Sequence, residues 1–213
     1  MKPPKCYNKT IFYLRGVFMK DTRVKPYALF GFSLSKQLAF IAVFAALCAV
    51  STLLIVIPLP TGYFNTGDVF VLLAGWCLGP LYGSVAAGVG GALADIISGF
   101  PVYAPATFFI KAGVALVAYF AFILFSKLIR KETLSVLPRS FSAILGETVM
   151  VTGYFVYEIF LYGFSGAIAT LFGNALQGIC CMLLATCLLT LLCSIRGIKT
   201  FFPALTSTKK ERK

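Results

Sequence analysis

Long apolar runs alternate with short polar segments over most of the chain. Apolar runs of about twenty residues recur, and an α-helix of that length crosses the hydrocarbon core of a bilayer. The pattern predicts six such helices, at residues 37–57, 67–81, 83–98, 106–126, 141–162 and 167–194. Hydrophobic residues make up 59% of the chain, and the mean hydropathy is +0.91. We therefore expect an all-α membrane protein, and the composition excludes a soluble domain.

The basic residues gather on one side of the predicted membrane domain. Of 19 Lys and Arg residues, eight precede the first helix, four lie between the fourth and fifth, and six follow the last; the remaining one is Lys111. The loops predicted on the other side, 58–66, 99–105 and 163–166, contain none. The positive-inside rule then places both termini in the cytoplasm. We divide the chain into a basic N-terminal segment (1–36), a transmembrane domain (37–195) and a basic tail (196–213).

The net charge of +12 at first suggests a nucleic-acid partner. Because the charge is concentrated at one membrane boundary, contact with anionic lipid explains it better. None of the seven cysteines forms a C-x-x-C pair, and small apolar packing is the simplest role for them. The chain has no histidine, the commonest general base and a common metal ligand. We expect neither a metal site nor a cofactor.

Three ionisable residues interrupt the apolar stretch from residue 65 to 111: Asp68, Asp95 and Lys111. Each costs roughly 2.5–3.5 kcal/mol in hydrocarbon on insertion scales, so together they indicate a polar cavity. Asp95 continues a face of small residues spaced four apart, Gly83 and Gly91 among them, and is expected to point into the bundle. Asp95 and Lys111 fall at similar depth, which predicts a buried ion pair between them but leaves a ligand contact open. Asp68 either stabilises its helix N-terminus or contacts a ligand.

The last two helices carry further polar side chains. Glu147 and Glu158 are three helical turns apart and share one face. Asn174 and Gln177 share a face of the next helix. Asp95, Lys111, Glu158, Asn174 and Gln177 are all predicted in the outer third of four helices, which favours one binding pocket over separate helix links. Further candidate binding residues are Asn65, Asp68, Tyr103, Thr107 and Tyr154, and Trp76, Tyr103 and Tyr154 are candidates for stacking on a ligand ring.

The first helix carries closely spaced alanines. Ala42 with Ala46, or Ala45 with Ala49, forms a small-xxx-small pair that lets another helix approach closely. The pattern fits a docking surface for a partner, and it equally fits ordinary packing within the bundle.

Over residues 37–195 the sequence resembles the substrate-binding S component of energy-coupling-factor (ECF) vitamin transporters. The segments that carry the resemblance are YFNTGDVFVLLAGWCLGPLYG, GGALADIISG, APATFFIK, GYFVYEIFLYG and FGNALQG. They are most similar to the branch that groups riboflavin-, hydroxymethylpyrimidine- and pyridoxine-type proteins. In that branch the last segment often begins Pro-Gly-Asn, and this chain has Phe172 at the proline position.

The resemblance implies six helices and a vitamin site near the outer surface of a bacterial cell membrane. It also implies a transmembrane coupling protein and two ATPase subunits as partners, with an alanine motif on the first helix as the contact. Ala42 and Ala46 are the best match to that motif, followed by Ala45 and Ala49. The chain has no GxxxxGK[ST] segment, so it is expected to be a transport subunit without its own ATPase activity, not an enzyme.

Two other functions were weighed. Residues 163–166 (GFSG) match the GxSG of rhomboid-type serine proteases, but the chain lacks the histidine that their serine needs. A stand-alone secondary transporter, coupled to protons through Glu147 or Glu158, remains an alternative. For the substrate, the carboxylates and amides favour a pyridoxine- or hydroxymethylpyrimidine-like vitamin, with riboflavin also possible.

Overall fold

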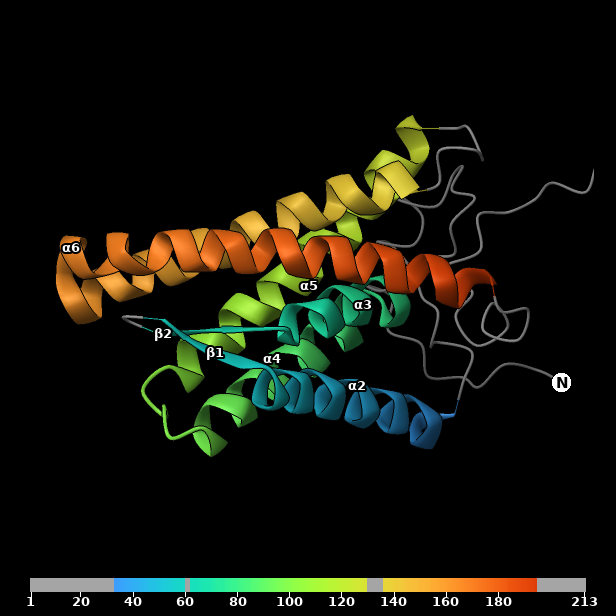
Figure 1. Cartoon of the computed structure of the whole chain (residues 1–213). Coiled ribbons are helices and arrows are strands. Elements are labelled where there is room, and N and C mark those ends of the chain that lie inside the picture. Colours follow the sequence, from blue (N-terminus) through green and yellow to red (C-terminus); the bar gives the residue numbers. More distant parts are fainter. Residues whose placement is uncertain (1–32, 60–61, 130–135, 195–213) are drawn as a thin grey trace, which may run out of the picture.

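The structure is a computed structural model that describes residues 33–59, 62–129 and 136–194. The helices and strands, in chain order, are α2 (Leu34–Leu54), β1 (Val56–Leu59), β2 (Gly62–Asn65), α3 (Gly67–Leu78), α4 (Pro80–Ile97), α5 (Ala104–Leu128) and α6 (Val136–Ser194). They form a bundle in which the hairpin β1–β2 and the sharp bend of α6 lie at the same end (Figure 1). We call this the hairpin end. The predicted basic tail, and the N-terminal segment before residue 33, lie outside the described residues.

Helix α6 is two helices joined by a single bend. Gly163 has φ 74° and ψ 176°, a backbone conformation that glycine adopts without steric cost. The bend divides α6 into a first arm, 136–162, and a second arm, 164–194, which run side by side (Figure 1). The two arms correspond to the predicted helices 141–162 and 167–194. The predicted loop 163–166 shrinks to one residue.

Helix α3 is shorter than predicted and lies at the centre of the bundle. It ends at Leu78, and its 12 residues extend about 18 Å, against a hydrocarbon core of about 30 Å. Eleven of the 12 are buried, as expected for a helix that is apolar on every side. In the described residues, α2, α4, α5 and α6 are long and apolar enough to cross a membrane. The count of six crossings therefore stays a prediction.

The segment predicted as an outer loop, 58–66, contributes to an antiparallel hairpin instead. Val56 pairs with Asn65 and Leu59 with Gly62. Strand β1 runs from the end of α2 towards the hairpin end, and β2 runs back inward, so that α3 begins part-way along the bundle (Figure 1). This return of the chain places Asn65 and Asp68 in the interior.

Close packing is confirmed at Gly83 and Gly91 of the small-residue face predicted on α4, and Gly90 adds a contact outside that face. A Cβ atom on Gly90 would lie 2.5 Å from the carbonyl oxygen of Ala45 on α2. One on Gly83 would lie 2.5 Å from the carbonyl oxygen of Ala74 on α3. A Cβ atom on Gly91 would lie 2.9 Å from Thr107 Cγ2 and 3.0 Å from Lys111 Cγ, both on α5. Only small residues permit these backbone approaches, which hold α4 against three neighbouring helices.

The distribution of polar and apolar side chains is that of a membrane protein. Large apolar side chains point outward, with Phe109, Phe160 and Phe172 between 74% and 82% exposed. Charged residues such as Lys111 and Glu158 are buried, and each is only 4% exposed. A lipid environment accounts for this exterior, because soluble monomers rarely expose large contiguous apolar surfaces.

Candidate functional site

A buried ion pair joins α5 to the first turn of α3. Lys111 Nζ lies 2.6 Å from Asp68 Oδ1, and the two side chains are 5% and 0% exposed. Lys111 thus has an ion-pair partner, Asp68, that the sequence did not predict, and the predicted pairing of Lys111 with Asp95 stays a prediction. The prediction started this helix at the outer surface, whereas α3 begins part-way along the bundle (Figure 1), and Asp68 in its first turn is fully buried. Asp95 is also buried, on α4, one turn beyond Gly91.

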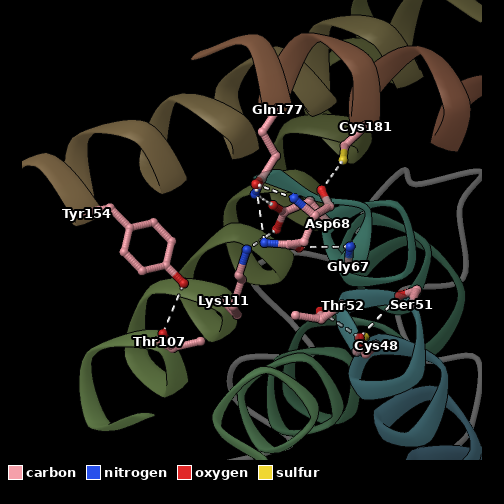
Figure 2. A network of polar contacts seen from close by, with 11 residues as sticks. Cys48, Ser51, Thr52, Gly67, Asp68, Thr107, Lys111, Tyr154, Gln177 and Cys181 are labelled. Atoms are coloured by element: carbon pink, nitrogen blue, oxygen red, sulfur yellow. Dashed lines mark hydrogen bonds and ion pairs between the residues drawn. The ribbon is translucent and has the colours of Figure 1, made fainter. Parts of the chain in front are cut away.

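Gln177 connects this pair to the second arm of α6. Its Nε2 donates to the other oxygen of Asp68, Oδ2, at 2.7 Å. Its Oε1 accepts from the backbone N–H of Asn65 at 2.9 Å and from Asn65 Nδ2 at 3.2 Å. Figure 2 shows Asp68 between Lys111 and Gln177. Both carboxylate oxygens of Asp68 thus have charged or amide donors, which is what a buried carboxylate requires.

The hairpin residue Asn65 is fixed on several sides. Its Oδ1 accepts from the backbone N–H of Gly67 at 3.0 Å, and its carbonyl oxygen accepts from Cys181 Sγ at 3.5 Å. Gly67 packs so closely against α2 that an added Cβ would lie 2.0 Å from Thr52 Oγ1. Sequence reasoning missed the role of Cys181, although it lies four residues after Gln177 and so on the same helical face.

A second polar contact lies beside Lys111. Thr107, one turn before Lys111 on α5, has its hydroxyl 3.0 Å from that of Tyr154 on the first arm of α6. The ammonium of Lys111 lies 5.4 Å from the centre of the Tyr154 ring, within cation–π range. Both hydroxyls belong to predicted site residues, and Figure 2 shows them facing each other.

Closer to the bend of α6, Glu158 contacts the second arm. It is 4% exposed and accepts a hydrogen bond from Thr170 Oγ1. Thr170 was not predicted; its only sequence signal is its position across the bend from Glu158. Tyr103, at the N-cap of α5, packs edge-on against Tyr157 with ring centroids 5.6 Å apart.

These groups follow one another inward from the hairpin end, and we call them the polar column: Glu158, Tyr154, Thr107, Lys111, Asp68 and Gln177. Glu158 is five residues from Gly163, about 7.5 Å along its arm, and Gln177 is fourteen residues from it, about 21 Å. Glu158 thus lies nearer the bend than Gln177, and the shared position in the outer third of the membrane stays a prediction. Asn174 lies one turn nearer the bend than Gln177 and is half-buried.

Trp76 is part of the core and does not stack on a ligand from its present position. It is 0% exposed, and its indole N–H donates to Ser142 Oγ at 3.1 Å. It lies near the end of α3 that is remote from the hairpin. The role of Trp76 in stacking on a ligand ring stays a prediction, and its buried, hydrogen-bonded position does not favour it.

The alanines of α2 divide between two surfaces. Ala45 and Ala49 are buried, with exposed fractions of 7% and 8%, and Ala45 packs against Gly90 of α4. Ala42 and Ala46 are exposed, on a different side of the helix. Ala42 and Ala46 thus remain available to an external helix.

The polar column combines hydrogen-bond donors and acceptors inside an apolar bundle. No group of three or more His, Cys, Asp or Glu side chains in the described residues is placed to hold a metal ion. The column offers hydroxyls, an amide, an ammonium and carboxylates on α3, α5 and the two arms of α6. Such a set suits a small molecule that carries both hydrogen-bond donors and acceptors.

Comparison with known proteins agrees with this description. A curated protein of Pyrococcus woesei, described as an uncharacterized protein in gap 3'region, is 38% identical over 134 residues, covering 61% of this chain and 83% of its own length. A solved structure titled "Structure and mechanism of the S component of a bacterial ECF transporter" matches with a TM-score of 0.58 at 25% identity. The match covers 76% of this chain and 98% of the solved one.

The family comparison is more specific. The family model for the ECF-type riboflavin transporter, S component, matches residues 33–194. That range includes every described helix and the whole polar column. S components are substrate-binding transport subunits of the membrane and not enzymes. The chain is a multi-pass membrane protein that belongs to the ECF-type riboflavin transporter S component family.

Proposed function

We propose that the protein binds a water-soluble heterocyclic vitamin at the hairpin end and delivers it across the membrane as the S component of an ECF transporter. The observation that carries the proposal is the polar column, a continuous set of polar side chains inside an otherwise apolar bundle. Keeping ionisable groups in hydrocarbon costs several kcal/mol, and binding of a polar ligand is a reason to retain them. The hairpin end faces the outside, since the loops there lack Lys and Arg.

Riboflavin is the substrate we propose first. The sequence patterns alone favour a pyridoxine- or hydroxymethylpyrimidine-like vitamin, but the matched family is described by riboflavin. The chemistry of the column fits: an isoalloxazine ring provides apolar surface and carbonyl acceptors for Lys111 and Gln177, and the ribityl chain provides hydroxyl groups for Glu158. The ring of Tyr154 offers a stacking surface.

Energy for transport comes from partners in this proposal. The chain carries no phosphate-binding GxxxxGK[ST] segment, so a coupling membrane protein and two ATPase subunits are required. The exposed pair Ala42 and Ala46 is the proposed contact for the coupling protein, because small side chains let two helices approach closely. Ala45 and Ala49 are buried against the bundle and are the weaker candidates.

Uptake of radiolabelled riboflavin tests this proposal against the stand-alone alternative. Cells that produce the protein together with the three ECF partners should accumulate riboflavin, and cells that produce the protein alone should not. An uncoupler of the proton gradient should have little immediate effect, whereas inactivation of the ATPase subunits should stop uptake. Uptake by the protein alone that an uncoupler abolishes would instead establish a proton-coupled transporter.

A further inference from the structure

The buried acid Glu147 is not part of the polar column. Glu147 lies on the first arm of α6, on the same face as Tyr154 and Glu158, sixteen residues from Gly163 and about 24 Å along the arm. It is 5% exposed, and neither of its carboxylate oxygens has a hydrogen-bond partner in the described residues. Buried carboxylates are almost always hydrogen-bonded or paired. Glu147 is therefore an exception that requires a physical reason.

Glu147 lies at the inner end of the polar column. A Cβ atom on Gly178 would lie 3.1 Å from Glu147 Cβ and 3.3 Å from its Oε2. Gly178 follows directly after Gln177, whose amide binds Asp68. Gly178 thus leaves room for the Glu147 carboxylate between the two arms, immediately beyond the Gln177–Asp68–Lys111 contacts.

The neighbouring donors do not satisfy Glu147. Lys111 directs its ammonium to Asp68 at 2.6 Å, and Gln177 directs its amide N–H to the same carboxylate at 2.7 Å. An acceptor that lacks a donor in the folded protein is costly, and such local conflicts concentrate at functional sites. A ligand that brings its own N–H or O–H group would remove the conflict.

The orientation of an amphiphilic ligand identifies which donor would reach Glu147. Riboflavin has a large apolar ring and a polyhydroxyl chain. Burial of apolar surface favours the ring in the interior, and hydration favours the chain near the hairpin end. The imide N3–H is the hydrogen-bond donor on the ring, and the polar side chains at the inner part of the column favour the imide edge over the dimethylbenzene edge at that position. Its two flanking carbonyl groups would then lie towards Lys111 and Gln177.

We propose that Glu147 is a further ligand contact, at the inner end of the polar column, where its carboxylate accepts a hydrogen bond from the ring N–H of the bound vitamin. This inference rests on the proposed function and adds to it a residue and a feature of the substrate. The vitamin must carry a donor on the part that enters first. No proton is transferred and no bond is formed in this contact.

The test combines one protein variant with one altered ligand. Purified full-length wild-type protein and Glu147→Leu are titrated with riboflavin and with 3-methylriboflavin, in which the N3–H is replaced by a methyl group. A charge-assisted hydrogen bond contributes about ten- to a hundredfold in affinity. Glu147→Leu should lose that factor for riboflavin, and the wild type should lose it for 3-methylriboflavin. Glu147→Leu should bind the two ligands equally.

Two further variants separate a ligand contact from a structural role. Glu147→Gln keeps an acceptor oxygen and should recover part of the lost affinity. Met150→Leu, a buried change on the same arm, should bind like the wild type. Without ligand, Glu147→Leu should melt at or above the wild-type temperature, because it removes a buried carboxylate that lacks a partner.

The possible failures are distinguishable. Unchanged riboflavin affinity in Glu147→Leu would overturn the inference while leaving the proposed function intact. So would a lost affinity that is accompanied by a clearly lower melting temperature, which would assign Glu147 a structural partner. Discrimination against 3-methylriboflavin that persists in Glu147→Leu would place the N–H contact at another residue. A wild-type protein that binds no riboflavin would contradict the proposed substrate itself, and the inference with it.

Discussion

Lys111 Nζ lies 2.6 Å from Asp68 Oδ1 in the interior of the bundle, and this pair joins α5 to the first turn of α3. Asp68 is fully buried, and its second oxygen accepts from Gln177 on α6. Three helices thus meet at one carboxylate. The pair is both the inner part of the proposed site and a strong constraint on how the helices pack.

Breaking this pair on one side should destabilise the protein. Lys111→Met and Asp68→Asn each leave a buried group without its opposite charge, and losing one partner costs roughly 3–5 kcal/mol. Both variants should melt at a lower temperature in detergent, and the double variant should recover part of the loss. Lys127→Met, an exposed change on the same helix, serves as the control and should melt like the wild type. Fully additive losses would show that the two residues act independently.

Glu158 should contribute to ligand binding near the hairpin end. Its buried carboxylate accepts from Thr170 and has further capacity to accept from a ligand hydroxyl. Glu158→Ala should weaken vitamin binding about ten- to a hundredfold, as expected for loss of a hydrogen bond of roughly 1.5–3 kcal/mol to a charged group. Isothermal titration calorimetry measures the change, with the exposed substitution Thr148→Ala on the same arm as the control. Wild-type affinity in Glu158→Ala would remove this residue from the site.

Replacing alanines of α2 by tryptophan should have different effects at the exposed and the buried pair. Ala42→Trp and Ala46→Trp add a large side chain on an exposed surface, so the isolated protein should fold and bind its vitamin normally. Uptake by the whole complex should be abolished, because the coupling protein is kept at a distance. Ala45→Trp should instead disrupt folding, since Ala45 packs against Gly90. Vitamin binding is measured on the purified protein and uptake on cells with the whole complex. Normal uptake in both exposed variants would exclude this surface as the docking site.

A matched pair of glycine substitutions tests the packing around Lys111. A Cβ on Gly91 would lie 2.9 Å from Thr107 Cγ2 and 3.0 Å from Lys111 Cγ, so Gly91→Ala should displace both side chains. Overpacking of this kind costs roughly 1–3 kcal/mol, and ligand affinity should fall with it. Gly113→Ala meets only a Val149 methyl at 3.5 Å and should be neutral or slightly stabilising. Equal behaviour of the two variants, in melting and in binding, would contradict the close approach of α4 and α5.

Much of the fold follows from the apolar pattern. The helices from α4 onward begin and end within a few residues of their predicted limits, apart from the start of α6, which lies five residues earlier. The close-packing role of Gly83 and Gly91 was readable from their spacing, because residues four apart share a helical face. The hairpin was not readable, since Pro58 and Pro60 indicate a loop as strongly as a turn.

The site was predicted in its residues but not in its connections. Asn65, Asp68, Lys111 and Gln177 were all named as candidate binding residues, with Asn65 expected in an outer loop, and hydrogen bonds or ion pairs link them in the structure. Asp68 was not predicted as a partner of Lys111, because the prediction assumed that every helix begins at the membrane surface. Which carboxylate meets Lys111 depends on where α3 begins, and tertiary packing rather than local pattern sets that position.

Native mass spectrometry of the purified protein tests the central claim most directly. The protein is released from detergent without added ligand, and any bound small molecule is identified by its mass and fragmentation. A vitamin bound at one copy per chain is the predicted result, with riboflavin expected, and the Glu158→Ala variant should retain less of it. A protein that carries no vitamin and takes up none when vitamins are added, while melting as a folded protein, would contradict the account.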